Sequence, residues 1–125
     1  MNNTIINVDY YDVAKTGLKV VRVGFNDEYT KVDLGFLYSD ERENILKITD
    51  KIYLSDHTEK KKLIECIGVN LDEEIKLKSV KDFRYFSLKF EAFNEQKDKL
   101  MLVQSNSNGT KIAIIAIQLP KKTES

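Results

Sequence analysis

The chain has 125 residues, of which 42% are hydrophobic and 32% charged, and its 20 basic and 20 acidic residues give a formal net charge of zero. This length fits a single domain spanning residues 1–125, and the apolar fraction is large enough for a core, which excludes global disorder. Nucleic-acid-binding domains usually carry a basic excess. The chain has none and contains only three arginines, so we expect no nucleic-acid partner.

The sequence leaves the cellular compartment open. No stretch reaches the ~20 apolar residues of a membrane span, and residues 1–12 contain neither the basic nor the apolar part of a signal peptide. The protein is therefore either cytoplasmic or, if an export signal has been removed, extracytoplasmic. The single cysteine, Cys66, excludes an intrachain disulfide, and its apolar neighbours predict a small buried side chain rather than a reactive thiol.

Short apolar segments with β-branched or aromatic residues recur along the chain, separated by polar turns. Within the second of these segments, Val21, Val23 and Phe25 are expected to share one face, with Arg22 on the other. The predicted strands, in chain order, are Ile5–Tyr10, Leu18–Phe25, Val32–Tyr38, Ile45–Leu54, Leu63–Val69, Phe83–Phe93, Leu100–Gln104 and Lys111–Leu119.

The middle of the chain, Ile52–Val69, predicts two strands joined by a charged turn at residues 56–59. Three lysines, at positions 60–62, follow the turn. We expect them to protect a strand edge from pairing with another chain. A break in the preceding strand is expected near Thr49, and residues 70–82 are predicted to form a loop with one short strand.

Two strands predict the core. Phe86, Leu88 and Phe90 alternate with polar residues and should point inward. Residues 112–117 are apolar on both faces, which is typical of a central strand covered on both sides. The expected buried residues there are Ile112, Ile114, Ile115 and Ile117. Asn108-Gly109, just before this strand, is a strong hairpin signal.

Seven or eight short strands at roughly regular spacing predict an all-β fold, an antiparallel sandwich. A small closed β-barrel uses the same alternation and remains the alternative.

Residues 48–119 resemble small immunoglobulin-like β-sandwich domains of uncharacterised bacterial, mostly exported, proteins. The resemblance lies in the segments Tyr53–Glu74, Phe86–Phe93, Leu100–Gln104 and the final strand through Leu119. It implies an immunoglobulin-like sandwich and an extracytoplasmic location. The prolines usual after the Phe-rich strand are missing here. Because such domains serve many unrelated functions, the resemblance implies no activity.

No catalytic, metal-binding or cofactor-binding residues are predicted, and we expect the domain not to be an enzyme. His57, the only histidine, has no evident triad or metal partners, and no serine lies in a G-x-S-x-G context. The acidic runs at positions 40–43 and 72–74 lack the ligand order of a calcium loop.

We expect a non-catalytic interaction or accessory domain that binds a protein partner through strand edges or loops. The alternative is a module that binds a small polar ligand or a carbohydrate through its tyrosines and the loop at residues 105–110; an enzyme is least supported. A concave patch of exposed tyrosines would favour the ligand, and a flat apolar edge the protein. The candidate interaction residues are Tyr29, Tyr53, His57, Asn106 and Asn108.

Overall fold

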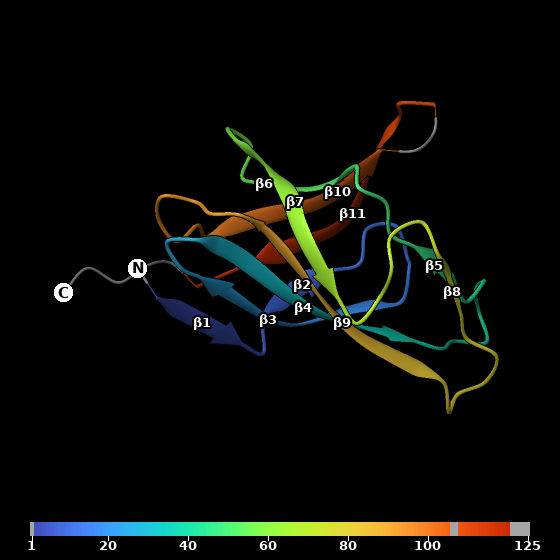
Figure 1. Cartoon of the computed structure of the whole chain (residues 1–125). Helices are drawn as coiled ribbons and strands as arrows, with labels where there is room; N and C mark the ends of the chain where they lie inside the picture. Colours follow the sequence, from blue (N-terminus) through green and yellow to red (C-terminus); the bar gives the residue numbers. More distant parts are fainter. Residues whose placement is uncertain (1, 106–107, 121–125) are drawn as a thin grey trace.

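The computed structural model describes residues 2–105 and 108–120, and in that part of the chain the regular structure consists of β-strands alone (Figure 1). Within these residues no helix could cross a membrane. The predicted all-β, antiparallel class is confirmed, and the described residues form eleven strands rather than the seven or eight predicted. The strands are β1 (Asn3–Ile6), β2 (Asp9–Tyr11), β3 (Leu18–Phe25), β4 (Tyr29–Leu37), β5 (Ile45–Lys47), β6 (Ile52–Ser55), β7 (Lys60–Ile67), β8 (Glu74–Lys76), β9 (Phe83–Glu91), β10 (Lys99–Ser105) and β11 (Lys111–Gln118).

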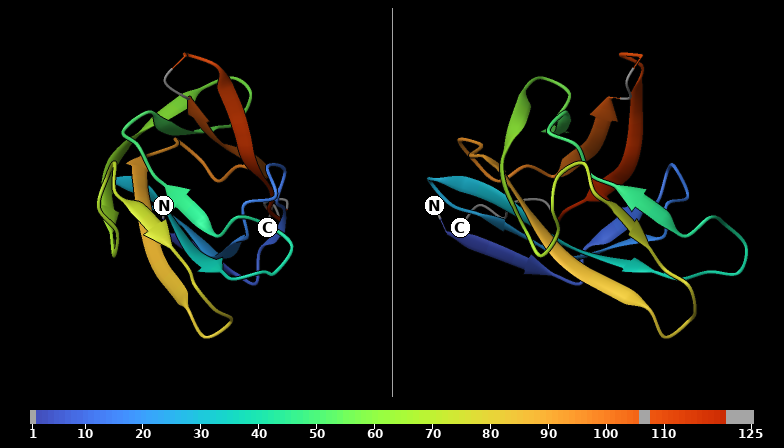
Figure 2. Two further views of the ribbon diagram at one scale, coloured as in Figure 1. Left: turned by 90° about the vertical axis from the view of Figure 1, so that its right-hand side faces the viewer. Right: turned by 45° about the vertical axis from the view of Figure 1, so that its right-hand side comes forward.

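Nine of the strands form one antiparallel sheet in the order β1-β3-β4-β9-β7-β6-β10-β11-β2, and β5 pairs with β8 in a separate ladder. Strand pairing is unbroken from β1 to β2. The sheet curls, so that β10 and β11 lie across from β3, β4 and β9 (Figure 2). This curl gives the sheet an inner face that surrounds the core and an outer face that meets solvent.

Side chains from both halves of the curled sheet fill one core. Phe86, Leu88 and Phe90 are 4%, 0% and 0% exposed, so the predicted inward face of β9 is confirmed. Three of the four isoleucines predicted in the last strand are also buried: Ile114, Ile115 and Ile117. The side chain of the fourth, Ile112, lies outside the described residues.

The first predicted strand, Ile5–Tyr10, is wrong as a single element. The backbone turns at Asn7, which has φ 53°, a left-handed conformation that asparagine tolerates better than most residues. Val8 is buried in the core. As a result β1 pairs with β3, whereas β2 pairs with β11 at the opposite edge of the sheet.

The predicted face of β3 is also corrected. A bulge between Val20 and Arg22 leaves Val21 without a partner on β4. The extra residue shifts the alternation, so Val23 is buried but Val21 is only half-buried. Alternation alone cannot predict this shift, because the sequence pattern of a bulge looks like that of a continuous strand.

The lysine run does not protect a strand edge, because β7 lies inside the sheet. Residues 60–62 of β7 pair with β6, and residues 63–67 pair with β9. A register shift between Leu63 and Glu65 separates the two pairings. β7 therefore joins the two halves of the curled sheet. The predicted break near Thr49 and the short strand within residues 70–82 are both confirmed, as the gap between β5 and β6 and as β8.

Candidate functional site

Two of the predicted interaction residues, Tyr29 and Tyr53, are half-buried. The Lys89 Nζ atom lies 4.5 Å from the centroid of the Tyr29 ring, and the Lys60 Nζ atom lies 5.1 Å from that of Tyr53. These cation–π contacts cover one face of each ring. The face of each ring that the lysine covers is not open for stacking.

The other predicted interaction residues lie apart from these tyrosines. His57 is exposed in the turn between β6 and β7, where its φ is 82°. Asn108 is exposed in the connection from β10 to β11, and Asn106 lies outside the described residues. Tyr29 and His57 line different hollows. The predicted residues therefore do not form one site.

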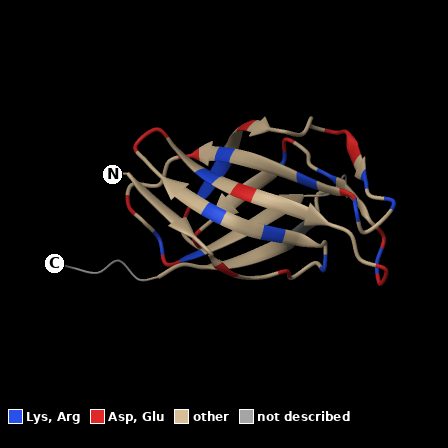
Figure 3. Cartoon of the chain, turned by 90° about the horizontal axis from the view of Figure 1, so that it is seen from below, with Lys and Arg blue, Asp and Glu red and all other residues tan. Residues whose placement is uncertain are grey.

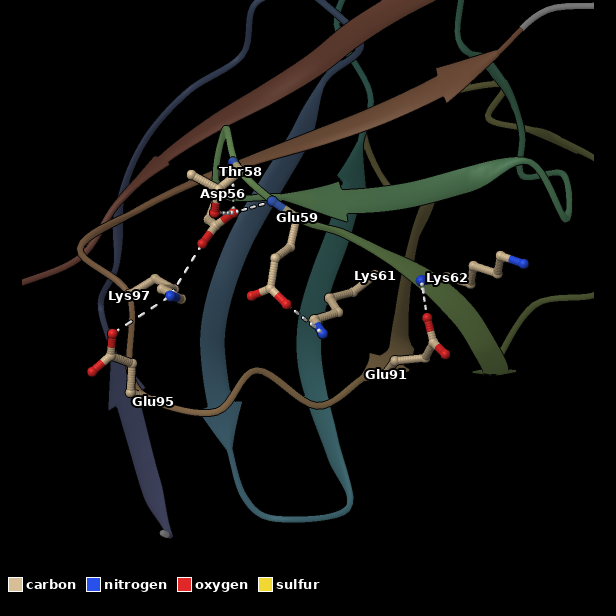
Figure 4. A network of polar contacts seen from close by, with 8 residues as sticks. All are labelled: Asp56, Thr58, Glu59, Lys61, Lys62, Glu91, Glu95 and Lys97. Carbon is tan, nitrogen blue, oxygen red and sulfur yellow. Dashed lines mark hydrogen bonds and ion pairs between the residues drawn. The ribbon is translucent and has the colours of Figure 1, made fainter.

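The turn that carries His57 is held by Asp56 (Figure 4). Asp56 Oδ1 accepts hydrogen bonds from the Glu59 amide at 2.7 Å, the Thr58 amide at 2.9 Å and the Thr58 hydroxyl at 2.9 Å. Asp56 Oδ2 lies 3.1 Å from Lys97 Nζ, in the connection from β9 to β10. Burial raises the pKa of Asp56, but these donors lower it more, so its pKa lies well below the ordinary range.

A second polar network lies on the outer face of the sheet, centred on Asp33 of β4. Asp33 is 9% exposed and accepts hydrogen bonds from Arg22 of β3 and Ser87 of β9. Lys31 Nζ lies 3.7 Å from Asp33 Oδ1, the oxygen that accepts from Ser87. Burial raises the pKa of Asp33, and the hydrogen bonds from Ser87 and Arg22 and the nearby positive charges lower it below its usual value. The network therefore links β3, β4 and β9 through their side chains.

Basic side chains of three strands gather around Asp33. Arg22 lies opposite Asp33, Lys31 lies opposite Lys89, and Glu65 of β7 lies on the other side of Lys89. Figure 3 shows this face of the sheet from below, with several basic stretches along its strands. We call Arg22, Lys31 and Lys89 the basic cluster.

Next to the basic cluster, the same face carries exposed apolar side chains. Phe83 and Tyr85 are each 57% exposed, and their ring centroids lie 5.4 Å apart in an edge-to-face arrangement. Leu37, the β4 partner of Phe83, is 37% exposed. The Tyr85 ring lies over Gly35, where an added Cβ would come within 2.8 Å of Tyr85 Cε1. We call Leu37, Phe83 and Tyr85 the aromatic patch.

The aromatic patch was missed by sequence reasoning, although the signal for it is present. Phe83 and Tyr85 have the same parity along β9 as Ser87 and Lys89, which were assigned to the wet face. Strict alternation therefore places both rings outside the core. The presence of three other phenylalanines in the segment, at positions 86, 90 and 93, obscured this.

A hollow of about 360 Å³ lies on the outer face of β2, β11 and β10. Cross-strand neighbours Tyr11, Ala116 and Met101 form one row of it. Asp9, Gln118 and Lys99 form the next row on the same face, and His57 lies at its margin. We call this the Tyr11 hollow. Of its residues, His57 was a candidate interaction residue, and Tyr10 and Tyr11 belong to the tyrosines of the alternative carbohydrate-binding module.

Reactive side chains do not gather at either surface. Cys66 is half-buried, and its thiol donates to the Val69 carbonyl at 3.2 Å, so it packs against the core as a small apolar residue would. Within residues 2–105 and 108–120, no three of the His, Cys, Asp and Glu side chains lie close enough together to hold a metal ion.

Comparison of the chain with protein families, curated proteins and solved structures finds no match.

Proposed function

We propose that this protein is a non-catalytic interaction domain that binds a partner protein on the outer face of β4 and β9. The observation that carries the proposal is the aromatic patch. Two rings, each more than half exposed, lie beside a leucine on the outer face of β4 and β9, next to the polar network of Asp33. Leaving such a cluster in water is unfavourable, and neighbouring exposed apolar side chains mark interaction sites.

The charges beside the aromatic patch indicate the chemistry of the partner. The basic cluster presents three cations, which Asp33 and Glu65 neutralise only in part. A partner surface with an apolar centre and an acidic rim complements this face. The apolar centre would supply affinity, and the acidic rim would supply orientation and rate of association.

The face is a better docking surface than the sheet edges expected from the sequence. The edge strands of the sheet, β1 and β2, have only four and three residues, which limits the main-chain hydrogen bonds that an added strand could form. Tyr85, in contrast, packs against Gly35 and Phe83 on the outer face. A partner that covers the two rings together removes both from water.

Affinity capture from a native extract tests the proposal. The bait is the wild-type chain or the double variant Phe83→Ser/Tyr85→Ser, and the matched control is Val80→Ser, which removes a side chain that is 80% exposed outside the patch. We expect a partner that is retained by wild type and Val80→Ser, lost by the double variant, and released by raised salt. Retention by the double variant would contradict the proposal.

The same variants distinguish binding of a different protein from self-association of this chain. If sedimentation shows self-association that the double variant abolishes, the patch is a homodimer contact and the proposed partner is wrong. A monomeric wild type that captures an acidic protein supports the proposal.

For the architecture, we propose the immunoglobulin-like sandwich over the closed barrel. What supports this is that β1 and β2 stand at the two ends of the strand order, with no pairing between them among the described residues. Side chains from both halves of the sheet also contribute to one core, as expected for a sandwich. Amide hydrogen bonds between β1 and β2, measured by NMR, would favour the barrel.

A further inference from the structure

The Tyr11 hollow has a floor that follows from strand register. Tyr11 lies opposite Ala116, and Ala116 lies opposite Met101. A small side chain therefore lies between two large ones, which leaves the middle of the row lowest. Tyr11 is 67% exposed, so its ring forms a wall of the hollow rather than part of the core. The volume of about 360 Å³ falls within the range of small-ligand sites.

The row beside this apolar floor is polar and has unused hydrogen-bonding capacity. Neither Asp9 nor Lys99 makes a side-chain hydrogen bond or ion pair with another described residue. The Gln118 amide nitrogen donates to the carbonyls of Asp98 and Leu119 at 3.0 and 3.2 Å. Its Oε1 atom remains an acceptor. The hollow thus presents a carboxylate, an amide oxygen and an ammonium group along one side.

We propose that the Tyr11 hollow binds a neutral saccharide. A sugar ring has one face of C–H groups, which fits the apolar row of Tyr11, Ala116 and Met101, and a rim of hydroxyls. Each hydroxyl both donates and accepts, so it can donate to Asp9 and accept from Lys99. The charges of Asp9 and Lys99 cancel, which favours an uncharged ligand over an acidic or basic one.

The residues that line the Tyr11 hollow distinguish it from the aromatic patch. The hollow combines an apolar floor with a polar row and has room for a small ligand, whereas the patch is a group of exposed apolar side chains. The two surfaces also lie on different strands, β2, β10 and β11 for the hollow and β4 and β9 for the patch. The saccharide proposal therefore stands or falls independently of the proposed protein partner.

A printed array of neutral glucans, xylans, mannans and galactans, with acidic polysaccharides for comparison, provides the probes. NMR titration with the neutral oligosaccharides that are retained then locates the site. We expect shifts in the amides of residues 9–11, 99–101 and 116–118. Tyr11→Ala should weaken binding about tenfold, because it removes the stacking surface. Tyr11→Phe, which keeps the ring, should bind almost as wild type does.

Tyr85→Ala is the matched control, since Tyr85 is similarly exposed on the other face. It should leave saccharide binding unchanged. The proposal is overturned if no neutral glycan binds, if only acidic polysaccharides bind, or if Tyr11→Ala retains full affinity with an unchanged folded spectrum. Loss of binding in Tyr85→Ala alone would move the ligand to the aromatic patch and overturn it as well.

Discussion

At the scale of single residues, the turn at residues 56–59 shows what local sequence can and cannot predict. Asp56 was predicted to lie in a polar turn, and its carboxylate accepts hydrogen bonds from the Thr58 and Glu59 amides of that turn, as aspartate commonly does. Its ion pair with Lys97 could not be predicted. The two residues are 41 positions apart, and only the path of β7 and β9 brings them together.

Asp56 predicts how stability depends on pH. Its pKa is lowered in the folded protein, so its contribution is full above the unfolded pKa of about 3.9 and is lost as pH falls through the folded value. Above about pH 5, Asp56→Asn should lower the free energy of unfolding by about 1.5–3 kcal/mol, the range for hydrogen bonds to a charged group. Urea unfolding from pH 7 to pH 2 measures this.

The difference between wild type and Asp56→Asn should shrink as the solution is acidified below about pH 4. Asp50→Asn is the control, because Asp50 is exposed and accepts no side-chain hydrogen bond from a described residue. Its effect should be small at every pH. A difference for Asp56→Asn that stays constant down to pH 2 would show that the carboxylate charge is not what stabilises the turn.

Two glycines provide a second test at this scale. Gly68 and Gly109 both have positive φ, at 93° and 80°. An added Cβ at Gly68 would lie 3.0 Å from the Tyr85 carbonyl oxygen, whereas at Gly109 it would meet nothing within 4 Å. Gly109→Ala should cost about 1–2 kcal/mol for the backbone conformation alone. Gly68→Ala should cost more, and equal thermal midpoints for the two variants would contradict this.

At the scale of elements, alternation predicted the strands well wherever it was uninterrupted. β9 was placed correctly because its inward residues are large and its outward ones polar along the whole centre of the strand. β1, β2 and β3 were described less well. A left-handed residue and a bulge each reset the alternation, and neither leaves a distinct mark in the sequence.

Phe90→Ala and Lys89→Ala test the register of β9. Phe90 is fully buried, so its truncation should cost roughly 3–5 kcal/mol. Lys89 points to the outer face and contacts the Tyr29 ring at 4.5 Å. Its truncation should cost below about 1 kcal/mol, the range for exposed cation–π contacts. Chemical denaturation of both variants measures the difference, and comparable losses would mean that the register is wrong.

At the scale of the whole molecule, the class was predictable and the strand order was not. Period-two patterns and turn residues specify strands, but they do not say which strands pair. The pairing of β4 with β9 and of β7 with both β6 and β9 joins distant parts of the chain. For the same reason the sequence could not show that the aromatic patch and the basic cluster share a face, or that Tyr11 lies beside Met101.

The fold class predicts a circular dichroism spectrum dominated by β-structure. Every regular element in the described part of the chain is a strand. A measured helix content above about a third, the average for globular domains, would contradict the fold. The core variant Phe90→Ala is a useful companion, since the β signal should disappear at a lower temperature in that variant.

The placement of β1 and β2 has a consequence for the order of folding. β1 and β2 lie at opposite edges of the sheet, and only two residues, Asn7 and Val8, connect them. This short connection therefore spans the gap between the two edges. β1 pairs with β3 and β2 with β11, so each can dock only after its own partner strand is in place. We therefore expect β1 and β2 to dock last during folding and to detach first. Their amides should exchange hydrogen for deuterium well before those of β4 and β9.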